Sequence, residues 1–526
     1  MSVLEFLELG GNRLEGEIPK SLWNICTLQS LSLESNHLNE SLYITTICPN
    51  HPLQELYLYD NPFTGLFPNL TIFSCLESLY FSNTLIDGVI SEHHFANLSY
   101  LTYLDLSSNT FTFNVSSTWL PPFNLKKIHL SSCKLGPEFP SWLRTQTNCK
   151  VLDISNNAIS DSIPTWFWNT ITSFVEINVS NNGIKGIIGI DAQASIRSGM
   201  LDMRYNQLEG TLPNCWSRLS HLQVLNLGKN HNLSGTLPTS IGSLASLEAL
   251  HLDHNKFTGA LPSSIKNCSR LISLHLGHNS LFGPIPDWVG ESITQLSILV
   301  LTSNNFNANV PTTLCRLQSL QLLDLSLNHL SGTIPKCISN LTQMMNITLG
   351  IPTISYEFSF TLTILNQTWH AEATEDDKIE VTWKGAVFEF GSRLRDVKSI
   401  DLSSNMLSGE IPTEITSLVA LVSLNLSRNN LQGHIPLRIG NLAQLNFLDL
   451  SSNHLSGSIP PSIALIDDIG VLNLSNNKLS GKIPKGTQLQ SFDASAYMGN
   501  PALCGDPLPN SCSGEESTSP PHQFSE

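Results

Sequence analysis

The chain repeats one arrangement of apolar and polar residues along most of its length. Between Leu28 and Asn36, leucine occupies the first, fourth and sixth positions, and asparagine closes the segment. The same arrangement returns at residues 247–255, 271–279, 421–429 and 445–453. With the asparagine as position zero, apolar residues at −5 and −3 alternate with polar ones, which predicts a short strand with one buried face. We expect this strand at about −5 to −2, with the leucines at −8, −5, −3 and +2 pointing inward.

The closing asparagine, called the anchor below, or its replacement recurs through the chain. The eighteen anchors are Asn12, Asn36, Asn61, Thr84, Asn109, Cys133, Asn157, Asn182, Asn206, Asn230, Asn255, Asn279, Asn304, Asn328, Asn405, Asn429, Asn453 and Asn477. They stand 23 to 25 residues apart, except for the 77 residues between Asn328 and Asn405. This period and pattern are those of the leucine-rich repeat. Threonine is not a usual anchor, so we expect a looser turn at Thr84.

Such repeats are stable only as a stack, because a single one cannot bury its apolar face. The sequence therefore predicts an α/β-type solenoid, a leucine-rich-repeat horseshoe with a parallel concave β-sheet and about 18 repeats interrupted by one island. We expect repeats 1–14, without an N-terminal cap, at residues 1–343, the island at 344–397 and repeats 15–18 at 398–484. A C-terminal cap at 485–512 and a polar juxtamembrane-like tail at 513–526 should follow.

Composition excludes several functions. The chain holds 27 basic and 43 acidic residues, a formal charge of −16, which disfavours nucleic acid and anionic lipid as partners. Sequence motifs of serine hydrolases, zinc proteases and phosphate-binding loops are absent. Aspartates are frequent at strand positions, but they recur with the repeat and do not form an isolated acid–base pair. We predict a protein that is not an enzyme and that needs no cofactor and no metal.

Cysteines and glycosylation signals suggest an extracellular location. The eleven cysteines include Cys504 and Cys512 around the expected cap, and Cys26 and Cys48 at similar places in adjacent repeats, two pairs that we expect to be disulfides. Cys315 and Cys337 are a weaker third pair. The glycosylation sites that we predict from Asn-x-Ser/Thr signals are Asn39, Asn69, Asn97, Asn114, Asn232, Asn340, Asn346 and Asn366.

The two ends of the sequence lack targeting features. Residues 1–12 have the pattern of a repeat strand and not of a signal peptide. No run of apolar residues has the length of a transmembrane helix. We expect the chain to be a piece of a longer protein.

The segment between the two blocks of repeats carries a resemblance to a known family. Residues 381–385 have the sequence Val-Thr-Trp-Lys-Gly, four repeats follow, and the last leads into the Cys504–Cys512 segment. This arrangement, with Leu-x-Gly-x-Ile-Pro in plant-type repeats, resembles the plant leucine-rich-repeat receptor-like proteins, in the branch of fungal-xylanase and Cf-type resistance receptors. The resemblance implies a cell-surface ectodomain at the plasma membrane that signals through partner receptor kinases. It implies partner docking near the island, at Trp383, Lys384, Asp401 and Asn425.

Candidate ligand-binding residues are departures from the usual residues at −4 and −2. Most repeats carry Asp or Asn at −4 and Ser at −2, as in Asp105 and Ser107. The departures that we select are Tyr57, Tyr59, Tyr80, His129, Arg204, His251, Asp253 and His275. Tyrosine and arginine dominate protein interfaces, so we hypothesise that these residues contact an extracellular peptide or protein ligand. The alternative is a set of ordinary solvated side chains. For His251 and His275, coincidence is favoured over a metal site or a pH switch.

The sequence favours a non-catalytic ligand-recognition ectodomain in plant defence signalling. One alternative is a receptor for a developmental peptide. Another is a secreted inhibitor of microbial cell-wall-degrading enzymes, similar to polygalacturonase inhibitors, although the number of repeats and the island speak against it.

Overall fold

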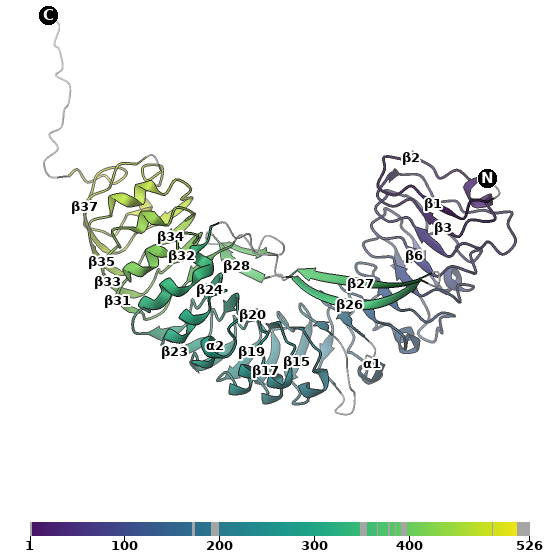
Figure 1. Ribbon diagram of the computed structural model, residues 1–526, viewed down its shortest axis with the longest axis horizontal. Coiled ribbons are helices and arrows are strands. Elements are labelled where there is room, and N and C mark those ends of the chain that lie inside the picture. Colours follow the sequence, from purple (N-terminus) through teal and green to yellow (C-terminus); the bar gives the residue numbers. More distant parts are fainter. Residues whose placement is uncertain are drawn as a thin grey trace, which may run out of the picture. The chain divides into compact units, whose positions relative to one another are not determined.

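The computed structural model describes residues 3–170, 174–190, 199–347, 355–364, 367–376, 379–383, 386–390, 397–486 and 488–512. The chain divides into two compact units. Figure 1 labels helices and strands of both. Unit 1 comprises Met1–Thr258, Pro262–Cys268 and Tyr356–Glu375. Unit 2 comprises Gly259–Leu261, Ser269–Ser355 and Asp376–Glu526. In both units the repeats stack through parallel strands, which confirms the predicted leucine-rich-repeat solenoid.

Unit 1 contains a parallel sheet with one three-residue strand from each repeat. Its strands are β1 (Phe6–Glu8), β3 (Ser30–Ser32), β5 (Glu55–Tyr57), β6 (Ser78–Tyr80), β8 (Tyr103–Asp105), β10 (Lys127–His129), β11 (Val151–Asp153), β12 (Glu176–Asn178), β14 (Met200–Asp202), β16 (Val224–Asn226) and β18 (Ala249–His251). Each strand occupies positions −6 to −4, so the expected span of −5 to −2 is wrong. The strand ends early because position −1 turns into the left-handed region, with φ of 52° at Ser35 and 53° at Asp60.

The inward-pointing leucines form the core as predicted. Leu28 and Leu31 are fully buried, and Leu33 and Leu38 are nearly so. Each buried leucine contributes about 1.5–3 kcal/mol through removal of apolar surface from water. The same columns are buried in repeat after repeat, so the core is one continuous stack within each unit.

The anchors close the turns by hydrogen bonds between neighbouring repeats. Asn36 Nδ2 donates to Leu9 O and Leu33 O at 3.0 Å each, and Asn36 Oδ1 accepts from Leu14 N at 2.9 Å. Thr84 is also buried, and its backbone N and Oγ1 donate to Asn109 Oδ1 at 3.0 and 2.6 Å. Thr84 is therefore bonded to the following repeat, whereas Asn36 is bonded to the preceding one, and the looser turn at Thr84 stays a prediction.

A second set of strands in unit 1 follows the anchors. It comprises β2 (Glu15–Gly16), β4 (His37–Leu38), β7 (Val89–Ile90), β9 (Thr112–Phe113), β13 (Lys185–Gly186), β15 (Gln207–Thr211), β17 (Asn232–Thr236) and β19 (Lys256–Gly259). Glycine at +4 permits the bend that follows, as at Gly16 with φ of 83°. The short helices are η1 (Leu22–Asn24), η2 (Glu92–Phe95), η3 (Ser141–Thr145), α1 (Thr165–Thr170), η5 (Trp216–Leu219), η6 (Thr239–Ser243) and η7 (Ser263–Asn267).

Unit 2 has the same construction. Its first sheet contains β20 (Ser273–His275), β22 (Ile298–Val300), β24 (Leu322–Asp324), β30 (Ser399–Asp401), β32 (Ser423–Asn425), β34 (Phe447–Asp449) and β36 (Val471–Asn473). The second set of strands contains β21 (Ser280–Pro284), β23 (Asn305–Asn309), β25 (His329–Ser331), β31 (Ser408–Glu410), β33 (Asn430–His434), β35 (His454–Gly457), β37 (Lys478–Lys482) and β38 (Ala502–Cys504). The helices are α2 (Trp288–Glu291), η8 (Thr312–Arg316), η9 (Lys336–Asn340), η10 (Thr342–Met345), η12 (Thr413–Ser417), η13 (Ile439–Asn441), η14 (Pro461–Leu465) and η15 (Ala494–Ala496).

The solenoid of unit 2 continues directly across the break in the repeats. Strand β24 pairs with β30 in parallel, with Asp324 opposite Asp401. In the sequence between β24 and β30, β26 (Ser355–Ile364) pairs with β27 (Gln367–Asp376), and nearly all of this pair belongs to unit 1. In unit 2, β28 (Ile379–Trp383) pairs with β29 (Ala386–Phe390) in an antiparallel hairpin. Met344 is fully buried in the repeat core. The island is thus an insertion that leaves the register of the ladder unchanged.

The C-terminal cap continues the pattern of the repeats by a turn that the sequence count missed. Asn500 Nδ2 donates to Leu474 O, and Asn500 Oδ1 accepts from Leu479 N, both at 2.9 Å. Asn500 therefore acts as a further anchor. A disulfide joins Cys504 to Cys512, and two others join Cys26 to Cys48 and Cys315 to Cys337. None of the helices in the described ranges combines the length and apolarity that a bilayer crossing requires.

Candidate ligand-binding surface

The side of the strands opposite the leucine core carries the candidate residues. We call the residues at −6, −4 and −2 of each repeat the inner wall. The register places Ser32, Tyr57, Tyr80, Asp105 and His129 on one line across five neighbouring strands. Positions −4 and −2 were predicted, whereas the column at −6 was missed. Strand alternation was the available signal, because −6 stands two residues before −4 and shares its face.

The tyrosines of the first repeats form one cluster. The rings of Tyr57 and Tyr80 are stacked, with centroids 5.1 Å apart and planes 19° from parallel. The Nζ atom of Lys127, from the missed column, lies 5.7 Å from the centroid of the Tyr80 ring. Burial raises the pKa of both Tyr57 and Tyr80 above the usual value, and the Glu55 carboxylate adds to the rise at each. Both hydroxyls therefore stay protonated and available as donors.

Carboxylates surround this cluster. Glu55 is buried, and burial raises its pKa, while a hydrogen bond from Ser30 opposes the rise and the Glu77 and Glu8 carboxylates add to it. The Oγ of Ser32 donates to Glu34 Oε2. Tyr59 also has a raised pKa, first through burial and then through Glu34, Asp60 and Asp105.

His129 has charged neighbours that its isolated place in the sequence did not reveal. Its Nδ1 lies 3.9 Å from Asp105 Oδ2. Burial and the nearby Lys127 lower the pKa of His129, whereas Asp105 acts in the opposite direction. The imidazole is therefore neutral near pH 7. It is a polar member of the wall and adds no positive charge there.

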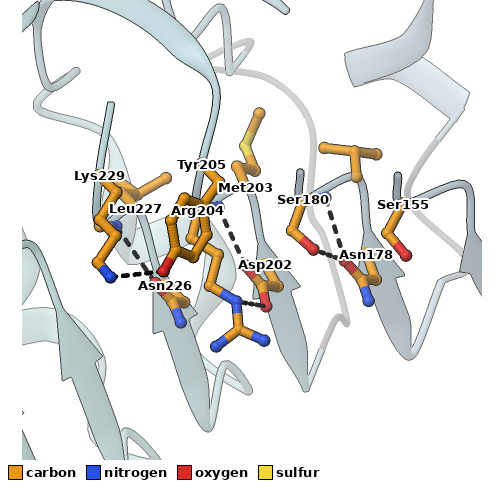
Figure 2. Close-up of polar contacts among 12 residues, drawn as sticks. Ser155, Asn178, Ser180, Asp202, Met203, Arg204, Tyr205, Asn226, Leu227 and Lys229 are labelled. Atoms are coloured by element: carbon orange, nitrogen blue, oxygen red, sulfur yellow. Dashed lines mark hydrogen bonds and ion pairs between the residues drawn. The ribbon is translucent and has the colours of Figure 1, made fainter. Parts of the chain in front are cut away.

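A second cluster lies further along unit 1 (Figure 2). Arg204 Nε lies 3.1 Å from Asp202 Oδ2. Beside this pair, Lys229 Nζ donates to the Tyr205 hydroxyl and lies 4.4 Å from the centroid of its ring. Tyr205 and Lys229 were missed because they occupy −1, where φ is 53° and 57°. Their signal was present in the sequence, since most repeats have Ser or Asn at −1.

The two candidate histidines belong to different units. His251 ends β18 in unit 1, and His275 ends β20 in unit 2. In unit 1, Asp253 Oδ2 lies 3.0 Å from Nδ1 of His254, a residue that was not selected. Participation of both histidines in one ligand site remains a prediction. Across the described ranges, His, Cys, Asp and Glu side chains form no group of three suited to a metal ion.

The wall of unit 2 after the island is internally bonded. Asp401 Oδ1 accepts from Ser403 N, and Asp401 Oδ2 accepts from Asn425 Nδ2, both at 2.9 Å. Burial and the adjacent Asp401 raise the pKa of Asp324 to about 7. Asp401 and Asn425 are thus brought together. Trp383 ends β28, whereas Lys384 lies outside the described residues.

Most predicted glycosylation sites are at the surface. Six of them are exposed: Asn39, Asn69, Asn97, Asn114, Asn232 and Asn340. Asn346 is half-buried, and Asn366 lies outside the described residues. The exposed asparagines do not belong to the inner wall. Glycans attached there would leave that surface accessible.

Family models and known proteins agree with this fold. The leucine-rich-repeat family models match residues 3–25, 148–170, 199–257, 319–341, 396–418, 420–442, 444–465 and 469–488. The HAESA ectodomain of Arabidopsis, solved with the peptide hormone IDA and the co-receptor SERK1, matches with a TM-score of 0.73 and 29% identity over 96% of this chain and 75% of that one. The fold and its repeats define a leucine-rich-repeat solenoid protein.

Sequence relatives narrow the class. The chain is 41% identical to Receptor-like protein EIX2 of Solanum lycopersicum, over 80% of this chain and 45% of the relative. It is 32% identical to Receptor-like protein 18 of Arabidopsis thaliana, over 80% of this chain and 48% of the relative. The chain belongs to the plant leucine-rich-repeat receptor-like proteins. It spans about half the length of these curated relatives.

Proposed function

We propose that this chain is the non-catalytic, ligand-recognising part of a plant cell-surface receptor-like protein. The observation that carries the proposal is the change in the inner wall of unit 1, where tyrosine, arginine and histidine replace the usual Asp or Asn and Ser. Similarity to Receptor-like protein EIX2 supports a receptor. The HAESA ectodomain was solved with a peptide hormone, which supports a peptide or protein ligand.

The inner wall suits recognition for physical reasons. Its side chains project from short strands, held by hydrogen bonds on both sides, and from the residue two places after each strand, so little backbone entropy is lost on binding. Tyrosine rings supply large contact areas and a polar hydroxyl, and arginine supplies a planar donor group. Tyr57 and Tyr80 are already stacked, and Arg204 is already oriented by Asp202. A ligand would therefore meet a surface that needs little rearrangement.

Signalling would require a second protein. We infer that partner receptor kinases dock near the island and the repeats after it, with Trp383, Lys384, Asp401 and Asn425 as candidate contacts. The presence of the co-receptor SERK1 in the HAESA complex supports a partner of this class. The full receptor would act at the plasma membrane, with this part on the extracellular side.

Defence against microbes is the pathway that we favour, because the sequence resembles the branch of fungal-xylanase and Cf-type resistance receptors and is 41% identical to Receptor-like protein EIX2 over 80% of this chain. Perception of a developmental peptide is the second candidate, and the peptide hormone in the HAESA complex favours it. A secreted inhibitor of microbial wall-degrading enzymes is a third candidate. A polygalacturonase inhibition assay with the purified chain distinguishes such an inhibitor from a receptor, because part of a receptor should leave the enzyme active.

The ligand proposal is tested in the full-length receptor. Two double variants, Tyr57→Ala with Tyr80→Ala and His251→Ala with His275→Ala, should each weaken ligand binding by about tenfold or more. A matched control is Ser451→Ala with Ser475→Ala on the usual wall of unit 2, which should bind as the unaltered receptor does. Unchanged affinity in both double variants, with circular dichroism showing an intact fold, would show that the selected residues do not form the ligand site.

A further inference from the structure

The inner wall of unit 1 changes its charge along the stack. Between positions −7 and −1, the first five repeats contain no lysine, arginine or histidine. The acidic residues in the same positions are Glu5, Glu8, Glu34, Glu55, Asp60, Glu77 and Asp105. The sixth repeat begins with Lys126 and Lys127. The acidic stretch therefore ends sharply, and it coincides with the tyrosine cluster.

We propose that the wall formed by Glu34, Glu55, Tyr57, Tyr59, Tyr80 and Asp105 binds a cationic peptide segment that presents lysine or arginine side chains. We call this surface the acidic tyrosine wall. The inference rests on the proposed function, in which the inner wall binds a peptide or protein, and it adds the chemical class of that ligand. Charge complementarity selects the occupant, because an acidic partner would meet carboxylates over the whole surface.

The protein's own lysines show that these rings accept cations. Lys127 Nζ lies 5.7 Å from the centroid of the Tyr80 ring, and Lys126 Nζ lies 5.8 Å from that of Tyr103. Both contacts are within the range of cation–π attraction. They lie at the C-terminal end of the acidic stretch, where the chain itself supplies the positive charge.

The Tyr57 ring offers a similar place for a cation on the face that points away from Tyr80. Its neighbour toward the C-terminus in the register is Tyr80, which covers one face. Its neighbour toward the N-terminus is Ser32, whose side chain is too short to cover a ring. Tyr57 is half-buried. A ligand ammonium or guanidinium group beside Ser32 would therefore meet the ring of Tyr57 and the carboxylates of Glu34 and Glu55.

Glu34 and Glu55 of this wall have charge available for a ligand. In the described part of the chain, neither Glu34 nor Glu55 forms an ion pair with a basic side chain. The raised pKa of Glu55 shows that its ionised form is held at a cost, through burial first and then through Glu77 and Glu8. A bound cation would relieve that cost. Affinity should accordingly fall as the pH is lowered and Glu55 becomes protonated.

The test uses the full chain and a fluorescein-labelled dodecapeptide of alternating lysine and glycine, followed by fluorescence anisotropy. Two matched probes have the same length, one with every lysine acetylated and one with glutamate in place of lysine. We expect the lysine peptide to bind at least tenfold more tightly than the acetylated one, because acetylation removes the positive charge. Equal binding of these two probes would overturn the proposal.

Variants separate the wall from the general negative charge of the chain. Glu34→Gln with Glu55→Gln should weaken binding of the lysine peptide by about tenfold or more. Glu15→Gln with Glu17→Gln makes the same change in charge at two exposed residues of unit 1 outside the wall, and it should leave binding unchanged. Tyr57→Ala should weaken binding by about tenfold, whereas Tyr57→Phe keeps the ring and should retain most of it. Equal losses in the two glutamate pairs would also overturn the proposal.

The experiments distinguish failure of the cationic-peptide proposal from failure of the proposed receptor function. If the lysine peptide shows no preference for the wall but the full-length receptor still needs Tyr57 and Tyr80 for its own ligand, the wall binds ligand and only the cationic class is wrong. If neither measurement depends on these tyrosines, ligand recognition at this wall is wrong as well.

Discussion

The first five repeats of unit 1 and the last four repeats of unit 2 share one backbone but have different inner walls. In the last four, Asp or Asn at −4 accepts hydrogen bonds from Ser at −2, as Asp449 Oδ1 does from Ser451 N at 2.9 Å. Amide side chains also bridge repeats, as Asn425 Nδ2 does to Asp401. In the first five, stacked tyrosines stand near Glu34 and Glu55, which form no ion pair with a basic side chain in the described part of the chain. The wall of the last four repeats is bonded internally, whereas the wall of the first five is the surface at which we propose that a ligand binds.

The first five and the last four repeats should have equivalent cores, and truncation of a core leucine, which should have the largest effect on stability, tests this. Leu79→Ala and Leu424→Ala both remove fully buried leucines at position −5. Each should lower the free energy of unfolding by about 2–5 kcal/mol, through lost transfer free energy and a residual cavity. Urea denaturation followed by hydrogen exchange in each unit measures both losses. A large loss at only one position would mean that the cores differ as well as the walls.

The anchors should show the next largest effect. Asn429 Nδ2 donates to three backbone oxygens, and its Oδ1 accepts from Leu407 N at 3.0 Å. Asn429→Ala should therefore cost about 3 kcal/mol by leaving buried backbone groups without partners. Thr84 donates only to Asn109, so Thr84→Ala should cost about 1–2 kcal/mol. Thermal unfolding ranks the two variants, and the reverse order would contradict the assigned roles of these hydrogen bonds.

The pairing of β24 with β30, which brings Asp324 beside Asp401, should make the free energy of unfolding of unit 2 depend on pH. Asp324 has a pKa of about 7 because it is buried beside Asp401. The folded state therefore holds a proton that the unfolded state has already released above about pH 4. It follows that the contribution of Asp324 to the stability of unit 2 is fully present below about pH 4 and is lost as the pH rises to about 7, by about 1.4 kcal/mol for each unit of pKa difference. Denaturation between pH 5 and 8 measures this slope, and Asp324→Asn should flatten it. Equal slopes in the two proteins would contradict the raised pKa of Asp324.

The smallest effects on stability are expected at the walls themselves. Tyr59→Ala in unit 1 and Ser451→Ala in unit 2 should each change the free energy of unfolding by less than about 1 kcal/mol. In ligand binding the same two variants should differ, because only Tyr59 belongs to the acidic tyrosine wall. Parallel melting and peptide-binding measurements make this comparison. A large loss of stability at Tyr59 would indicate a structural role for that side chain.

Several candidate residues were predictable because a period of about 24 residues maps each position to a column. Tyr57, Tyr59 and Tyr80 were selected in this way, and the register places Tyr57 opposite Tyr80. The contacts of Lys127 with Tyr80 and of Lys229 with Tyr205 were not predictable. They depend on the rotamers of the lysine side chains, which the repeat period does not determine.

By itself, the sequence determined the repeat, the buried leucine columns, the anchors and the columns from which the wall residues project, because hydrophobic periodicity constrains the direction of each side chain. Only the tertiary structure decided which wall residues touch. It joined Asp324 to Asp401 across the island, stacked Tyr57 on Tyr80, and made Asn500 an anchor within the cap. These contacts arise between neighbouring repeats, where packing and hydrogen bonding select one arrangement among several that the same pattern allows.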